Sequence, residues 1–320
     1  MDMMVFDGNV LQAAAVDNLE VLLQSSQDVV WIDIAHPDMQ ALQMLEKYLN
    51  FHPLAMEDTY NQHQRPKVEE YEDHLFIIFN RIVKVAGEYE FHELDVFLGH
   101  NYIVTVHYNC EALIQEVRER ITNKSIFKHP SSEFIFYALV DTIVDGYFPV
   151  LTEIDEAVED LSEQILTHAD QKMLAEIFQL RRTLNEIWRV VGAQRDMFNI
   201  LTRREHDLLV HHDMLEYYLR DVYDHLLRIS DTSMLLRENL NNLIDLYVSA
   251  NANRLNMVVN RLTVITIVIG VLTVISGFYG MNFEHTFPPF GVEWGVPFAL
   301  GLMLVISSVI LLVFKRLKLY

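Results

Sequence analysis

The sequence is short of cysteine and positive charge, and it lacks several common functional motifs. With a single cysteine, Cys110, among 320 residues the chain cannot form an internal disulfide, which fits a reducing compartment. Its 24 Lys and Arg stand against 45 Asp and Glu, a formal net charge of -21, so nucleic acid is not an expected partner. No GxxxxGKS motif, nucleophile–base motif or closed metal-ligand spacing occurs, so we expect neither nucleotide binding nor an enzyme. The first ten residues show no secretory signal.

Hydrophobic residues nevertheless make up 51% of the chain, because many are gathered in two runs near its C-terminus. Residues 264–281 (VITIVIGVLTVISGFYGM) and 296–314 (VPFALGLMLVISSVILLVF) contain no charged side chain. Each is long enough to cross a hydrocarbon layer of about 30 Å as a helix. Buried core helices are the alternative, but such long uncharged ones are rare beside so acidic a remainder. We therefore predict a membrane domain over 258–320, with spans at about 258–281 and 296–314 and a short external loop.

The positions of Lys and Arg around these spans predict their orientation. The basic residues nearest the spans are Arg254, Arg261, Lys315, Arg316 and Lys318, whereas residues 282–295 contain none. Because positive residues favour the cytoplasmic side, both termini are expected in the cytoplasm and only the loop outside, in a cytoplasmic (inner) membrane.

Residues 1–125 are predicted to form an N-terminal cytoplasmic α/β domain. VVWIDIA (29–35) is strand-like, and residues 37–50 have the pattern of a helix that begins at a proline. Residues 67–85 and 90–108 are rich in β-branched and aromatic residues and are expected to be paired strands.

Residues 126–257 are predicted to be a cytoplasmic helical region that includes a stalk helix. Between Pro149 and Gly270 the only Gly or Pro is Gly192. A single helix from Asp213 to Tyr279 would be about 100 Å long, so we expect it to project from the domain. Apolar residues along it alternate at spacings of four and three, which indicates packing against neighbouring copies or the chain's own helices.

Nearly every polar or glycine residue of the first span lies on one helical stripe. The stripe consists of Asn256, Val259, Thr263, Thr266, Gly270, Thr273 and Gly277, with Leu262 beside it. Small and hydroxyl residues can simply let helices approach closely. A polar stripe can also line a water-filled pore. Since one helix cannot enclose a pore, the second interpretation predicts several copies around an axis.

The end of this span carries a family resemblance. With YGMN (279–282) after the penultimate apolar helix and a second span at the C-terminus, the chain resembles the CorA family of magnesium transporters. Further segments in the family's order and spacing are HPLAMED (52–58), NQHQRPKVEEYEDHLFIIF (61–79), YALVDTIVDGYF (137–148) and RDVYDHLLRISDT (220–232). The resemblance implies an α/β domain, a stalk helix, two C-terminal transmembrane helices and a homopentamer whose first span lines the pore.

The resemblance further implies a channel for Mg²⁺, with Co²⁺ and Ni²⁺ as further cargo. Gly280, Met281 and Asn282 would form its selectivity filter, where amide and backbone oxygens hold a hydrated ion. Asn282 could otherwise cap the helix. Glu284 and Glu293 in the external loop could raise the local cation concentration, or be ordinary solvated acids. The membrane potential supplies about 4.6 kcal/mol per 100 mV for a divalent ion, so no nucleotide is needed.

Regulatory cations between neighbouring cytoplasmic domains are also implied. Asp58 and Asp221 match one regulatory metal site of the family, and Glu57 and Asp141 match a second, looser one. Carboxylates that face each other repel until Mg²⁺ bridges them, so bound cytoplasmic Mg²⁺ is expected to keep the channel closed. Each of these acids could instead be a solvated surface charge.

One departure from the family concerns the gate. Gly270 stands where family members often have a bulky apolar residue, which leaves Leu262, Val259 and Ile269 as gate candidates.

Two alternatives remain open: a Zn²⁺ transporter of the ZntB-like branch, and a non-conducting membrane-anchored sensor. Against the first, His211 and His212 point about 100° apart on a helix and make a poor Zn²⁺ pair. The two spans also contain no His, Cys or acid that could carry a proton.

Overall fold

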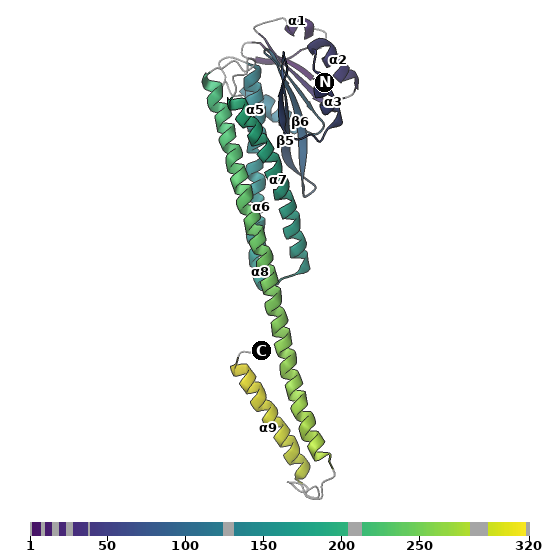
Figure 1. Ribbon diagram of the computed structural model, residues 1–320, viewed down its shortest axis with the longest axis vertical. Coiled ribbons are helices and arrows are strands. Elements are labelled where there is room, and N and C mark those ends of the chain that lie inside the picture. Colours follow the sequence, from purple (N-terminus) through teal and green to yellow (C-terminus); the bar gives the residue numbers. More distant parts are fainter. Residues whose placement is uncertain are drawn as a thin grey trace. The chain divides into compact units, whose positions relative to one another are not determined.

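The computed structural model describes residues 2–7, 10–14, 19–23, 28–37, 39–123, 131–203, 213–281 and 294–317 (Figure 1). The chain divides into two compact units. The first comprises residues 1–161 and 175–242, and the second comprises residues 162–174 and 243–320.

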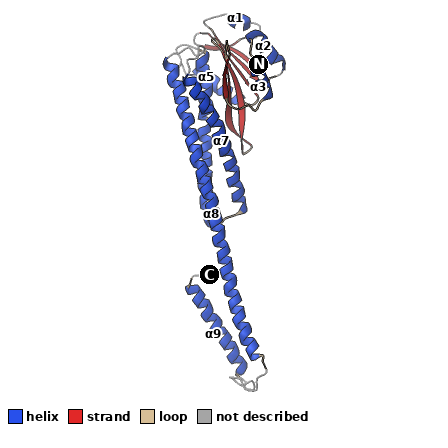
Figure 2. Cartoon of the chain, viewed as in Figure 1, coloured by secondary structure: helices blue, strands red, loops and turns tan. Residues whose placement is uncertain are grey.

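The first unit contains a seven-stranded mixed sheet with the order β2-β1-β3-β7-β6-β5-β4 (Figure 2). Its strands are β1 (Asp2–Asp7), β2 (Val10–Ala13), β3 (Val29–Ala35), β4 (Lys67–Glu70), β5 (Leu75–Val85), β6 (Glu88–Leu98) and β7 (Tyr102–His107). β3 and β7 are parallel, and every other neighbouring pair is antiparallel. β5 and β6 form a long hairpin whose turn, Ala86 and Gly87, has positive φ at both residues, as a tight two-residue turn requires.

The sequence pattern located this sheet but merged its strands. The run expected at 67–85 is two strands, because the chain turns back at residues 71–74, where the Tyr71 N–H donates to the His74 carbonyl. The run expected at 90–108 is also divided, at Gly99. A Cβ at Gly99 would lie 2.3 Å from the Tyr102 ring, so this turn has room only for glycine.

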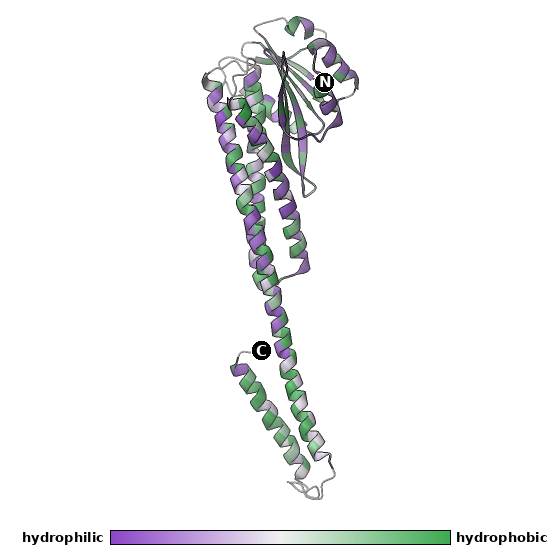
Figure 3. Ribbon diagram, viewed as in Figure 1, coloured by the Kyte–Doolittle hydropathy of each residue, from purple (hydrophilic) through white to green (hydrophobic). Residues whose placement is uncertain are grey.

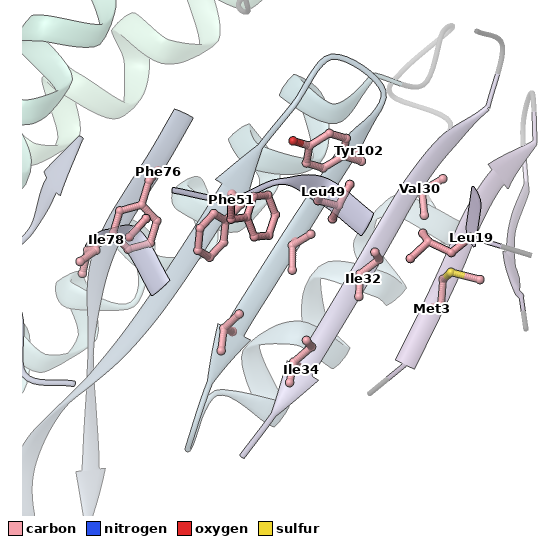
Figure 4. Close-up of a cluster of buried hydrophobic side chains, with 14 residues drawn as sticks. Met3, Leu19, Val30, Ile32, Ile34, Leu49, Phe51, Phe76, Ile78 and Tyr102 are labelled. Carbon is pink, nitrogen blue, oxygen red and sulfur yellow. The ribbon is translucent and has the colours of Figure 1, made fainter. Parts of the chain in front are cut away.

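Helices cover both faces of the sheet in the first unit (Figure 1). Its shorter helices are α1 (Leu19–Leu23), α2 (Met39–Leu49), α3 (Pro53–Asn61), α4 (Glu111–Asn123) and α5 (Ser132–Asp145). One core lies between the sheet and α1–α3, where Val30, Ile32 and Ile34 alternate along β3 and meet Leu49 and Phe51 (Figure 4). On the other face α5 contacts the sheet, and the Phe136 and Phe79 rings lie 6.0 Å apart. The strands are therefore buried on both faces of the sheet. The core on one of these faces holds α3 in position.

The long helices are α6 (Tyr147–Thr167), α7 (Gln171–Arg203), α8 (Asp213–Tyr279) and α9 (Gly295–Arg316). α8 runs for 67 residues without a break, as the lack of glycine and proline predicts. Figure 3 shows strong hydrophobicity along α9 and the C-terminal part of α8.

Among the described residues, three helical stretches are long and apolar enough to cross a membrane, judged by length and composition. The stretch Ser132–Thr167 has 72% of its apolar window buried within the protein, whereas the windows in Leu215–Tyr279 and Gly295–Arg316 are 6% and 0% buried. The first stretch therefore serves as core, and the other two coincide with the spans expected from the sequence.

Candidate ion pathway and cytoplasmic metal sites

The eight predicted pore-lining residues all lie on the exposed surface of α8. They are Asn256, Val259, Leu262, Thr263, Thr266, Gly270, Thr273 and Gly277. Val259 and Leu262 remain 57% and 62% exposed, although both are apolar.

The less exposed side chains of the same span lie on the opposite face of α8. Val264 is buried, and Val268, Val271 and Ile275 are half-buried. At about 100° per residue, Ile275 lies half a turn away from Thr266. No described residue of the chain covers the polar stripe, so the stripe does not serve contacts within one chain in the described part.

The threonine hydroxyls of the stripe donate their hydrogens to the backbone of their own helix. Thr263, Thr266 and Thr273 each donate a hydrogen bond of 2.8 Å to the backbone carbonyl four residues earlier. Each oxygen can then act towards its surroundings only as an acceptor. Acceptors suit a hydrated cation, because the water molecules of its shell point their hydrogens outward.

The two glycines of the stripe face open space. A Cβ at Gly270 or Gly277 would meet no heavy atom within 4 Å. Leu262 and Ile269, one heptad apart and 62% and 57% exposed, are the bulky apolar residues near Gly270. The gate candidates named from the sequence are therefore free to reach an axis.

The predicted filter lies only partly within the described residues. α8 ends at Tyr279, where the Gly280 N–H donates to the Ser276 carbonyl at 2.8 Å and the Met281 N–H to the Phe278 carbonyl at 3.3 Å. Gly280 is not among the described residues with positive φ, so its backbone is not in the left-handed conformation of a glycine C-cap. Asn282, Glu284 and Glu293, with their proposed roles, lie outside the described residues.

In the first unit, Asp58 on α3 is held by an ion pair. Lys67 Nζ on β4 lies 2.7 Å from Asp58 Oδ2 and 2.7 Å from Glu69 Oε1. Glu69 also accepts a hydrogen bond of 2.8 Å from the Tyr71 hydroxyl. The Asp58 side chain is 25% exposed, whereas Glu57 beside it is fully on the surface. The ammonium shows that the Asp58 carboxylate accepts a cation in this position.

Sequence reasoning missed two acids on β6 near Asp58, of which Glu93 is half-buried and Asp95 is buried. Glu93 accepts a hydrogen bond of 2.6 Å from the Gln64 N–H, and burial together with the charge of Asp58 raises its pKa to about 7. Complete burial, together with the charge of Glu93, raises the pKa of Asp95 well above its usual range. Their spacing of two in a strand was the available signal, because it places both side chains on one face of the sheet.

A second acidic group joins α5 to α8. Ligand atoms of Asp141, Asp145 and His225 all lie within 4.8 Å of one another. His225 Nδ1 is 3.5 Å from Asp145 Oδ1, and His225 Nε2 is 3.9 Å from Asp221 Oδ1. Asp141 is buried and ion-paired with Arg120. Burial and the charge of Asp141 raise the pKa of Asp145.

The structure thus brings Asp221 close to the residues around Asp141. Among the contacts of the described residues, none joins Glu57 or Asp58 to this group within one chain. Asp145 and His225 were not assigned to it from the sequence, although the pairs 141/145 and 221/225 each have the spacing of neighbours on a helix. Carboxylates that repel one another fit a cation, and the imidazole additionally suits metals such as Zn²⁺ and Ni²⁺.

Comparisons with known proteins show the family and the fold of the chain. The family model described as CorA-like Mg²⁺ transporter protein matches residues 26–316. The cobalt/magnesium transport protein CorA of Thermotoga maritima is 32% identical over 299 residues, which cover 92% of this chain and 84% of that protein.

Solved structures show the same fold. The complete structure of the CorA magnesium transporter from Methanocaldococcus jannaschii superposes with a TM-score of 0.82 at 24% identity, covering 99% of this chain and 98% of that one. The ZntB cytoplasmic domain from Vibrio parahaemolyticus has a TM-score of 0.63 at 13% identity and covers 79% of this chain and 97% of its own.

Proposed function

Since the chain belongs to the CorA family of Mg²⁺ transporters, we propose that it forms a homopentameric channel that admits Mg²⁺, and also Co²⁺ and Ni²⁺, into the cytoplasm. The ions move down the membrane potential, without a nucleotide. The chain then comprises a cytoplasmic α/β domain (1–125), a helical region (126–257) and a lipid-embedded membrane domain (258–320). Both termini face the cytoplasm, in keeping with the basic residues that flank the spans.

The observation that carries this proposal is the uncovered polar stripe on α8. A row of hydroxyls and glycines in lipid needs water or partners. Copies arranged around an axis turn these stripes inward, and the threonine oxygens then accept hydrogen bonds from the water shell of the passing ion. Asn282 amides at the outer end select the hydrated ion, with Gly280 and Met281 supplying backbone oxygens. Glu284 and Glu293 raise the cation concentration at the entrance.

Gating rests on the acids of the cytoplasmic part. Asp58 of one copy and Asp221 of the next hold a divalent cation between them, and Glu57 and Asp141 contribute to a second site. Their repulsion, when no cation neutralises it, loosens the contact between copies and opens the path at Leu262. The ion pair of Asp58 with Lys67 supports this assignment, because it shows this carboxylate holding a positive charge.

Flux into liposomes tests the proposal. The full chain is reconstituted with an internal Mg²⁺ dye and a potassium diffusion potential. Asn282→Ala should abolish Mg²⁺ entry, whereas Asn260→Ala, which removes an amide from the half-buried face of α8, should leave it nearly unchanged. Equal entry through the Asn282→Ala protein would contradict the filter, and a wild-type chain that passes no divalent ion would indicate a non-conducting sensor.

Zn²⁺ transport is the second candidate, and His225 beside Asp141 and Asp145 is the observation that favours it. The same liposomes, loaded with a Zn²⁺ dye and tested with and without a pH gradient, separate the two functions. Zn²⁺ entry that exceeds Mg²⁺ entry and depends on the gradient would replace the magnesium assignment.

A further inference from the structure

Lys67 is positioned between two carboxylates. Its ammonium lies 2.7 Å from both Asp58 Oδ2 and Glu69 Oε1, and the Lys67 side chain is only 30% exposed. Its Nζ also lies 5.6 Å from the centre of the Phe76 ring, beneath which the domain core begins. Such an ion pair is more sheltered from solvent than an ordinary surface pair, so water and salt screen it less.

Both sides of this ion pair are fixed by the fold. Asp58 lies on α3 between Ala55 and Thr59, which are 0% and 1% exposed. Lys67 lies on β4, opposite Ile78 of β5. The two charges are therefore set against each other by a helix that is anchored through Ala55 and Thr59 and by a paired strand.

More carboxylates than cations lie around the Lys67 ammonium. Asp58 and Glu69 contact it directly, and the buried Asp95 interacts with it electrostatically at longer range. Tyr71 donates a hydrogen bond to Glu69 and holds that carboxylate beside the ammonium. Lys67 is thus the cation that this acidic surface already holds when no metal is bound.

We propose that Lys67 is a built-in competitor of the regulatory cation for Asp58, and that it sets the Mg²⁺ concentration at which the cytoplasmic sensor fills. The inference rests on the proposed role of Asp58. A divalent cation at Asp58 and an ammonium at the same carboxylate repel each other, so metal binding must displace or share the Lys67 contact. Glu69 provides the second acceptor, to which the ammonium moves while keeping a paired charge.

Substitutions of Lys67 and of Glu69 should change the apparent Mg²⁺ affinity in opposite directions. Removing the charge of Lys67 should raise the apparent Mg²⁺ affinity on the order of tenfold, because the competitor is gone. Glu69→Gln should lower that affinity several-fold, because Lys67 then has Asp58 as its only carboxylate in contact. The double variant should behave as Lys67→Gln alone. If Lys67 merely supported Asp58, its removal would lower the affinity instead.

The readout is the Mg²⁺ concentration that half-protects the full-length purified protein from limited proteolysis, which requires no transport. Lys67→Gln should shift this midpoint to lower Mg²⁺, and Lys67→Arg should retain the wild-type value. Lys84→Gln is the matched control, since Lys84 lies on β5 of the same sheet, pairs with Glu153 of α6, and its loss changes the net charge equally. Thermal unfolding without Mg²⁺ checks that each variant folds, and Lys67→Met serves if the glutamine variant does not.

Asp58→Asn separates the failure of this inference from that of the proposed sensor. If Asp58→Asn keeps full Mg²⁺ protection, Asp58 holds no regulatory cation and both ideas fall. If Asp58→Asn loses protection while Lys67→Gln leaves the midpoint in place or moves it to higher Mg²⁺, only the competition by Lys67 is refuted.

Discussion

Thr266→Val should slow Mg²⁺ entry by about tenfold without weakening the fold. Valine has nearly the shape of threonine, and position 266 is exposed on α8, so no contact within the described chain is lost apart from the bond of the hydroxyl to the Leu262 carbonyl. What the channel loses is a ring of acceptor oxygens. A lost hydrogen bond to a neutral partner, here a water of the ion's shell, costs up to about 1.5 kcal/mol, which corresponds to roughly tenfold in rate.

The assay compares initial Mg²⁺ entry into liposomes at a fixed membrane potential and equal protein content. Thr266→Ser keeps the oxygen and should conduct within about twofold of the wild type, because the acceptor is retained. Val268→Thr adds a hydroxyl on the half-buried face of the same helix and should not raise the flux. Thermal unfolding in detergent reports whether the valine variant is folded.

Equal Mg²⁺ entry through the wild-type and Thr266→Val proteins would show that the stripe does not face the ion. If Thr266→Val conducts like the wild type while Asn282→Ala still abolishes Mg²⁺ entry, the proposal would apply to the outer filter alone. The stripe would then serve contacts between copies.

Three further predictions concern the gate and the cytoplasmic acids. Leu262→Ala should raise Mg²⁺ leak in high cytoplasmic Mg²⁺, since it removes an apolar side chain that is 62% exposed on the pore face; unchanged leak places the gate elsewhere. Arg120→Gln should lower the free energy of unfolding by about 2 kcal/mol in denaturant titration, less than for a fully buried pair because Arg120 is 29% exposed; no change would mean that Asp141 needs no partner. Burial raises the pKa of Glu93 to about 7, so its contribution to stability is present below the unfolded pKa near 4.5 and is lost as the pH rises through 7. Glu93→Gln should therefore stabilise the protein more at pH 8 than at pH 5, and an equal gain at both would contradict the shifted pKa.

The sequence predicted the long helices and the spans well, because the signals for them are local. A run without glycine or proline from Asp213 to Ile269, continued by an uncharged apolar run, predicted α8, and uncharged apolar runs predicted the spans. The strand pattern found the sheet but not its turns at residues 71–74 and at Gly99, since β-branched and aromatic residues resume directly after both.

The candidate sites were less accessible to sequence reasoning because they depend on contacts between distant segments. Nothing in the chain order indicates that Lys67 reaches Asp58 on another element, or that His225 on α8 meets Asp145 on α5. The family resemblance directed attention to Asp58 and Asp221 individually. The counter-charges around them came only from the fold.

The hydrogen bonds of the threonines on α8 have a further consequence for biogenesis. A newly made chain must enter the bilayer before it meets other copies, and an unsatisfied hydroxyl donor would oppose that step. Because Thr263, Thr266 and Thr273 donate to their own helix, placing an unassembled chain in the hydrocarbon layer costs little free energy. Insertion of the chain into the bilayer and assembly of the channel can therefore occur as separate steps, with unassembled chains remaining in the lipid in between.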